Sequence, residues 1–147
     1  MSIIRRSAIV PYSPQEMFDL VADIGAYGQF LPWCPVAQVL DREGNVVTAT
    51  IQIAYKGLNK SFTTCNSLYP GERMEMRLKE GPFSKLEGAW VFQALAETGS
   101  KISLDLQFEF SNRLLAIALG PVFGGIANSL VDSFRRRAVE VYGVRAL

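Results

Sequence analysis

The sequence offers few side chains that could transfer a proton or bind a metal ion near neutral pH, because its 147 residues include no histidine. Histidine is the usual base in Ser-His-Asp and Cys-His catalysis and the commonest zinc ligand, so these chemistries are not expected. Asp105 and Glu109 could form an acid–base pair on one face of a predicted strand, but they alternate with apolar residues and should be solvated. The sequence therefore predicts neither a catalytic constellation nor a metal site.

The two cysteines, Cys34 and Cys65, are too few for a disulfide framework, and their spacing matches no metal-binding motif. No histidine or lysine adjoins Cys34 in the sequence to lower the pKa of its thiol. We therefore expect two reduced, structural thiols, as is typical of a cytoplasmic protein.

The composition is apolar and nearly neutral, with 49% hydrophobic residues, 20% charged residues and a formal net charge of +1. General nucleic-acid-binding domains usually carry a strong basic excess, so no DNA partner is expected. A chain of 147 residues is long enough to bury its own core, and we expect residues 1–147 to form a single domain.

The first elements that must position the apolar residues are a strand and a capped helix. Residues 3–10 are rich in β-branched side chains and predict a strand. The segment SPQE at 13–16 is a capping box with proline at the first helical position, and it predicts a helix that ends near Gly25. A second helical or turn-rich piece is expected over 27–33, where prolines stop it.

Between residues 36 and 110 the hydrophobic period changes to two, which is typical of strands with one buried face. Short turns divide this stretch into six strands, a pattern that predicts an antiparallel meander. The predicted strands cover 36–42, 47–55, 60–68, 73–78, 86–92 and 102–110.

A long helix is predicted from a cap at Ser111 or Asn112 to about Gly143. The stretch 114–131 has no charged residue and is close to the lower length limit of a membrane span. Because glycine, proline, asparagine and serine interrupt it, we expect a helix that packs on the sheet, bent near Gly120 by Pro121.

One long helix lying across a curved sheet need not fill it, so we expect an apolar cavity between them. Aromatic and methionine side chains on the inward face could line it and offer an adaptable surface to an apolar ligand, although each could equally belong to an ordinary core. The glycines at 120, 124 and 125 could leave room for a ligand, let the helix hinge, or allow close helix–sheet packing. The candidate lining residues are Tyr55, Met74, Met76, Phe83, Trp90, Phe92, Phe108, Phe110, Leu119, Val122, Phe123 and Ile126.

Three segments resemble motifs of one known family. YGQFLPWC at 27–34 is similar to the Y-x-x-F-L-P-W-C signature of the coenzyme Q-binding START-like family, within the polyketide cyclase/dehydrase and lipid transport superfamily. LKEGPF at 78–83, with Leu86, Gly88, Trp90 and Phe92, resembles its L-x-x-G-P-F-x-x-L-x-G-x-W-x-F stretch, and SFRRRA at 133–138 is also similar. The resemblance covers nearly the whole chain. It implies an α+β helix-grip fold in which a curved antiparallel sheet of about seven strands wraps around the long C-terminal helix, with one or two short helices after the first strand.

The resemblance implies two roles, neither of which needs catalysis. Eukaryotic members bind ubiquinone and support respiration as lipid chaperones, whereas some bacterial members are toxins that bind the large ribosomal subunit and block subunit joining. We take binding of ubiquinone or a similar isoprenoid quinone, without a cofactor, as the first expectation and the ribosomal role as the alternative. A cyclase is a third reading that no residue set supports. The chain lacks a mitochondrial leader, so we expect a bacterial cytoplasmic protein that also contacts the periphery of the inner membrane.

Two further groups of residues are candidate contact sites. Phe30, Leu31, Pro32 and Trp33 could form a lid over the cavity, or a rigid turn whose aromatics fill the core. Arg5 and Arg6, with Arg135, Arg136 and Arg137, could touch ribosomal RNA or anionic lipid, or belong to a solvated helix end. An open apolar cavity would favour the lipid role, and a packed interior would favour a surface interaction.

Overall fold

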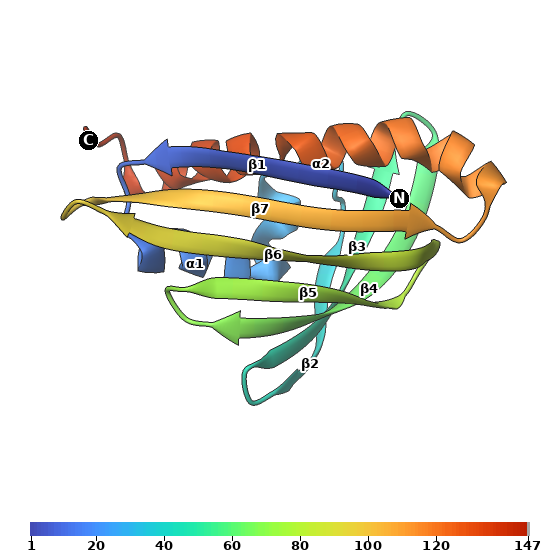
Figure 1. Ribbon diagram of the computed structural model, residues 1–147, viewed down its shortest axis with the longest axis horizontal. Helices are drawn as coiled ribbons and strands as arrows, with labels where there is room; N and C mark the ends of the chain where they lie inside the picture. Colours follow the sequence, from blue (N-terminus) through green and yellow to red (C-terminus); the bar gives the residue numbers. More distant parts are fainter. Residues whose placement is uncertain (147) are drawn as a thin grey trace.

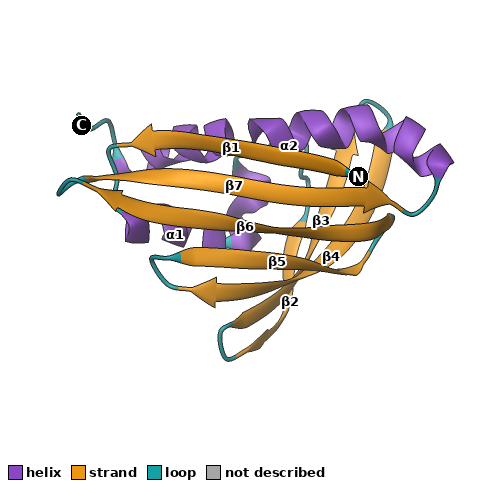
Figure 2. Ribbon diagram, in the orientation of Figure 1, coloured by secondary structure: helices purple, strands orange, loops and turns teal. Residues whose placement is uncertain are grey.

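The computed structural model describes residues 1–146 and contains one curved, seven-stranded antiparallel sheet with helices on its concave face (Figures 1 and 2). The expected α+β helix-grip fold is confirmed. The elements in chain order are β1 (Ser2–Val10), α1 (Pro14–Ala22), the 3-10 helix η1 (Ile24–Gln29), β2 (Ala37–Glu43), β3 (Val46–Tyr55), β4 (Leu58–Tyr69), β5 (Arg73–Glu80), β6 (Phe83–Leu95), β7 (Gly99–Phe110) and α2 (Arg113–Tyr142).

The strand order is β1-β7-β6-β5-β4-β3-β2, so β2 to β7 form the predicted meander and β1 adds to its far edge. All the pairings are antiparallel. Gly88 of β6 packs closely on the next strand, since a Cβ there would come within 2.3 Å of the Asp105 carbonyl oxygen on β7. Any larger residue at this position would therefore collide with the neighbouring strand.

The predicted helix caps are present. The Ser13 hydroxyl accepts from the Glu16 amide at 3.1 Å, while the Glu16 carboxylate accepts from the Ser13 amide at 3.0 Å. Asn112 caps α2, because its Oδ1 accepts from the Leu115 amide at 2.9 Å. Gly143, with φ of +86°, ends α2.

The second helical piece lies earlier in the chain than expected. The sequence predicts it over 27–33, whereas η1 covers Ile24–Gln29. Pro32 and Pro35 disfavour helical geometry in the residues before them, so the chain can wind only upstream of Leu31. A run of turn hydrogen bonds follows instead, including Cys34 N–H to the Leu31 carbonyl at 3.0 Å.

The core lies between the sheet and both helices. Phe18 of α1 packs edge-to-face on Phe92 of β6, and Phe134 of α2 packs in the same way on Trp90. These contacts place aromatic side chains from three elements in one layer. They cover the end of the concave face that lies away from the start of α2 (Figure 1).

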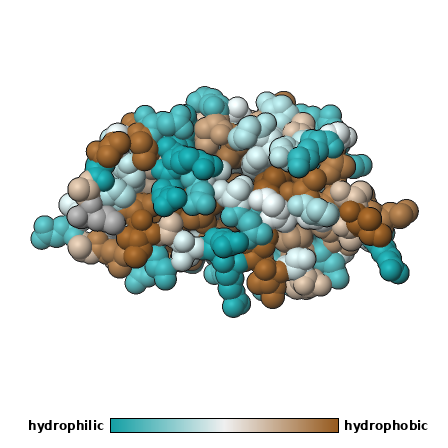
Figure 3. Space-filling model, turned by 90° about the horizontal axis from the view of Figure 1, so that it is seen from above, coloured by the Kyte–Doolittle hydropathy of each residue, from teal (hydrophilic) through white to brown (hydrophobic). Residues whose placement is uncertain are grey.

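The beginning of α2 extends beyond the sheet and leaves apolar side chains in solvent. Leu114 is 79% exposed and Ile117 is 67% exposed. Figure 3, seen from above the view of Figure 1, shows apolar side chains at the right-hand end, where α2 begins. By length and composition α2 could cross a membrane, yet it packs on the concave face, with 28% of its apolar stretch buried. α2 continues through Pro121, and a bend there stays a prediction.

Candidate functional site

An internal cavity of about 80 Å³ lies between the sheet and α2. Pockets that enclose small-molecule ligands typically measure about 300–1,000 Å³, so this cavity cannot hold a whole isoprenoid quinone. Of the sequence candidates, the cavity is lined by Trp33, Met74, Met76, Trp90, Phe123 and Ile126. The apolar cavity that the fold predicted is present, but the interior is mostly packed.

One wall of the cavity is polar. Thr64 and Asn66 of β4 both line it and are buried. The Asn66 amide nitrogen lies 3.0 Å from the Val47 carbonyl oxygen and 3.1 Å from the Thr64 hydroxyl. Sequence reasoning missed both residues, although their place in the alternation of β4 marks them as inward-facing.

A surface groove of about 660 Å³ runs between α2 and the segment that follows η1. Pro121, Val122 and Ile126 form its apolar side on α2, and Phe30, Pro32 and Trp33 face them. Lys56, Arg136 and Glu140 give the groove charges of both signs. Ser129 and Ser133, which the sequence analysis did not single out, also line it.

The groove and the internal cavity meet at two residues. Trp33 and Ile126 line both spaces, whereas the other predicted residues line one or neither. Trp33 is 8% exposed, and its indole Nε1 is buried without a hydrogen-bond partner among residues 1–146. Buried donors are nearly always paired, so this nitrogen needs an explanation.

The segment from Phe30 to Cys34 is held firmly in place. The Ala54 amide donates to the Trp33 carbonyl at 2.9 Å, and the Leu31 amide donates to the Tyr27 carbonyl at 2.9 Å. Leu31 and Cys34 are buried in the core, and burial raises the pKa of the Cys34 thiol. The arrangement favours the rigid-turn interpretation over a mobile lid, and a protonated Cys34 is a poor nucleophile.

Two predicted lining residues, Phe83 and Phe108, do not line the cavity. They form an aromatic cluster under the start of α2 with Phe123, whose ring centroid lies 4.7 Å from that of Phe108. Leu119 and Val122 cover this cluster, next to a void of only about 10 Å³.

Four other candidates also do not line the cavity. Tyr55 is 44% exposed and lines the outer groove instead of the cavity. Phe92 is buried and packs edge-to-face on Phe18 of α1. Phe110 stacks on Phe83 with centroids 5.0 Å apart, and Leu31 is core. Sequence period identifies the inward face, but it does not tell which inward residues border empty space.

The three α2 glycines are not required by close packing. A Cβ built at Gly120, Gly124 or Gly125 would have nothing within 4 Å. Gly125 lines the groove. The close-packing interpretation of these glycines is therefore wrong, and room beside the groove or hinge motion stays a prediction.

The five candidate arginines do not form one surface. Arg5 pairs with Asp105 at 3.4 Å on the convex face, whereas Arg6 donates to the Asn128 side chain of α2 at 2.9 Å. Successive residues of a strand point to opposite faces, which separates this pair.

The α2 arginines also point in different directions. Arg137 donates to Gln29 Oε1 at 3.0 Å and lies over the Phe30 ring, while Arg135 pairs with Asp132 at 3.2 Å. Arg136 lines the groove. Of these three arginines, Arg135 and Arg136 are exposed and could meet a large partner, whereas Arg137 is half-buried.

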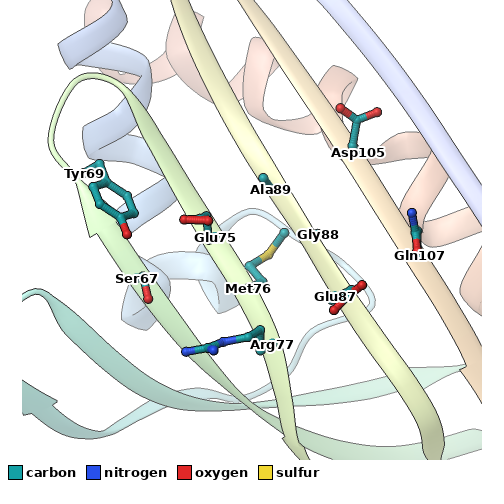
Figure 4. A pocket seen from close by; sticks show the side chains of 10 residues that line it. All are labelled: Ser67, Tyr69, Glu75, Met76, Arg77, Glu87, Gly88, Ala89, Asp105 and Gln107. Atoms are coloured by element: carbon teal, nitrogen blue, oxygen red, sulfur yellow. The ribbon is translucent and has the colours of Figure 1, made fainter.

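The convex face carries a shallow, polar depression of about 440 Å³ (Figure 4). Glu75, Arg77, Glu87 and Asp105 surround Gly88 there, on three neighbouring strands. The site is open and mixed in charge, with no feature of an enclosed ligand pocket. Within residues 1–146, no group of three His, Cys, Asp or Glu side chains could hold a metal ion.

Comparison with known proteins gives close relatives along the whole chain. The ribosome association toxin RatA of Pseudomonas aeruginosa is 45% identical over 140 residues, which cover 95% of this chain and 97% of that protein. RatA of Escherichia coli K12 is 41% identical over 145 residues, covering 99% and 92%. The mitochondrial coenzyme Q-binding protein COQ10 homolog B of Xenopus laevis is 26% identical, covering 93% of this chain and 58% of that protein.

Solved structures share the fold at low sequence identity. A START superfamily protein from Mycobacterium smegmatis has a TM-score of 0.79 at 19% identity, covering 95% of this chain and 98% of that one. The Zhui aromatase/cyclase from Streptomyces has a TM-score of 0.83 at 14% identity, covering 98% and 99%. The family profile for polyketide cyclase/dehydrase and lipid transport matches residues 10–135. This chain, with its helix-grip sheet and its START-like relatives, belongs to the polyketide cyclase/dehydrase and lipid transport family.

Proposed function

We propose that this protein is a ribosome-association toxin, which binds the large ribosomal subunit and blocks its joining to the small one in the bacterial cytoplasm. The observation that carries this proposal is the identity of 40–45% to proteins named ribosome association toxin along almost the full length of each chain. Proteins this similar over their whole length generally share their surfaces as well as their fold. The role needs no catalysis, in keeping with a chain that has no histidine.

The packed interior favours the ribosomal role over the binding of a lipid. The internal cavity of about 80 Å³ is smaller than the enclosed space that a lipid carrier needs, whereas a protein acting through its surface needs no such space. We therefore place the surface role ahead of the lipid role, reversing the first expectation from the sequence.

The outer side of α2 is the surface that we assign to the ribosome. Arg135 and Arg136 are exposed there, within a helix face that carries Asn128 and Asp132 one to two turns earlier. Exposed arginines bind phosphate oxygens of RNA with both charge and paired hydrogen bonds.

The test is sedimentation of ribosomes from cells that overexpress the protein. We expect the peak of joined ribosomes to fall, free subunits to accumulate, and the protein to travel with the large subunit. Unchanged profiles, with the protein at the top of the gradient, would reject the proposal.

A second candidate function is binding of ubiquinone or a similar isoprenoid quinone. The observation that favours it is the open groove of about 660 Å³, which meets the apolar internal cavity at Trp33 and Ile126. The matched Xenopus protein is named as coenzyme Q-binding. Organic extraction of the purified protein followed by mass spectrometry tests this role; protein that is consistently empty and takes up no added ubiquinone would reject it.

The lipid role would bring the protein to the periphery of the inner membrane, and the start of α2 is the surface that fits an anionic bilayer. Leu114 and Ile117 are the exposed apolar side chains there. Arg113 begins the same helix, and Lys60 of β4 lies near Leu119 and Val122, further along it. Apolar side chains framed by cations suit the interface of a membrane with acidic headgroups.

A further inference from the structure

The buried indole nitrogen of Trp33 is the starting point, because it is a donor for which the protein provides no acceptor. Its Nε1 is buried without a hydrogen-bond partner within the described chain. Leaving such a group unpaired is unfavourable unless a bound molecule satisfies it. The backbone that carries the ring is held in place, since the Trp33 carbonyl accepts from the Ala54 amide of β3 and the neighbouring Cys34 amide donates to the Leu31 carbonyl.

The serine hydroxyls that line the groove are already used within the protein, and the remaining uncharged donor there, the Tyr55 hydroxyl, belongs to a side chain that is 44% exposed. The Ser129 hydroxyl donates to the Ile126 carbonyl at 2.7 Å, and the Ser133 hydroxyl donates to the Ser129 carbonyl at 3.1 Å. Neither hydroxyl has a second proton to offer a ligand.

The uncharged donors on the cavity side of Trp33 also have acceptors within the protein. The Tyr27 hydroxyl donates to the Val21 carbonyl, and Asn66 donates to Val47 and Thr64. The Trp33 N–H is thus the one uncharged donor identified at the junction of groove and cavity that has no acceptor of its own among residues 1–146.

The surroundings select the chemistry of the acceptor. The junction carries no formal charge, because it is formed by Trp33, Ile126 and the apolar residues beside them. The charged residues lie on the rim of the groove, where Lys56 and Arg136 are positive and Glu140 is negative. A buried anion would find no paired cation at the junction, whereas a neutral carbonyl oxygen needs only one donor.

We propose that the Trp33 indole N–H donates a hydrogen bond to a ring carbonyl oxygen of a bound quinone, and that this bond makes Trp33 the specificity-determining residue of the site. The ring lies at the junction formed by Trp33 and Ile126, and the alkyl chain runs in the groove beside Pro121 and Val122, since the internal cavity is too small for it. This inference rests on the lipid-binding candidate function and is independent of the ribosomal role.

The experiment compares two ligands on three proteins. Equilibrium dialysis measures binding of a decyl-substituted benzoquinone and of decylbenzene, which has no carbonyl oxygen, to wild type, Trp33→Phe and the control Trp90→Phe. Trp90 also lines the cavity, so its replacement changes the wall without removing the proposed donor. We expect Trp33→Phe to weaken quinone binding about 5-fold with little effect on decylbenzene, and Trp90→Phe to keep the preference for the quinone.

A second measurement follows the indole N–H signals of the wild-type protein, so its result does not compare the affinities of different variants. The wild-type chain has two tryptophans, so a ¹⁵N NMR spectrum has two indole N–H signals, and Trp90→Phe assigns them. The quinone should move the Trp33 signal downfield, and decylbenzene should not.

The outcomes separate this inference from the function on which it rests. Equal binding of the two ligands by wild type, or an unmoved Trp33 signal while quinone binds, would overturn the role of Trp33 and leave lipid binding standing. Binding of neither ligand would overturn both.

Discussion

Arg145 closes over the capping box of the first helix by pairing with Glu16: its two terminal nitrogens lie 2.7 and 2.9 Å from the two carboxylate oxygens. The same carboxylate accepts from the Ser13 amide, so one side chain caps α1 and anchors the residues that follow α2. Tyr142 strengthens this junction by donating to the Glu16 carbonyl at 2.9 Å.

This junction predicts a pH-dependent contribution to stability. The Arg145 hydrogen bonds, with that from Ser13, lower the pKa of Glu16 below its ordinary value of 4.5. A lowered pKa in the folded state stabilises the protein above the unfolded value and loses this effect as the pH falls through the folded value. We expect Glu16→Gln to cost about 0.5–1 kcal/mol at pH 7 and less at pH 3.

Urea unfolding at the two pH values measures this difference. Glu97→Gln, in the exposed turn between β6 and β7, is the matched control and should change stability equally little at both. A cost for Glu16→Gln that is the same at pH 3 and pH 7 would contradict the role given to its charge.

Replacing a glycine by alanine should change the stability of the protein in opposite directions in the helix and in the sheet. A Cβ at Gly124 meets nothing within 4 Å, so Gly124→Ala should stabilise the protein by about 0.5–1 kcal/mol by favouring the helix. A Cβ at Gly88 would lie 2.3 Å from the Asp105 carbonyl oxygen, so Gly88→Ala should destabilise it by at least about 1–3 kcal/mol. Thermal and urea unfolding measure both; a destabilised Gly124→Ala would point to a helix that must bend there.

Ribosome binding should depend on the helix arginines more than on the strand arginines. Arg135→Glu with Arg136→Glu should reduce co-sedimentation with large subunits several-fold, and raised salt should do the same. Arg5→Glu is the control on the convex face, where Arg5 pairs with Asp105. Equal loss from Arg5→Glu and from the double variant would move the contact surface away from α2.

The apolar start of α2 should control binding to membranes without contributing to stability. Leu114→Ser and Ile117→Ser remove side chains that are mostly in solvent, so unfolding should change by less than about 0.5 kcal/mol. Flotation with vesicles rich in phosphatidylglycerol should fall markedly for the pair. Val139→Ser, on the same face nearer the C-terminus and 42% exposed, should float like wild type; flotation that the Leu114 and Ile117 changes leave intact would argue against this surface.

The sequence by itself determined the elements and their order. The period of two between residues 36 and 110 predicted the meander, and the caps at Ser13 and at Ser111 or Asn112 predicted where α1 and α2 begin. These signals are local, because alternation, capping and turn residues act within a few positions of the chain. The family resemblance also rested on short motifs, and the match over residues 10–135 confirmed it.

Tertiary structure alone decided which inward residues border empty space and which surface residues act together. Trp90 and Phe92 share one face of β6, yet Trp90 lines the cavity and Phe92 packs on Phe18 of α1. Arg5 and Arg6 are neighbours in sequence, yet they point to opposite faces of the sheet. Cavities and surfaces arise where distant segments meet, so their extent depends on how closely α2, η1 and the sheet approach one another, and no local pattern records that distance.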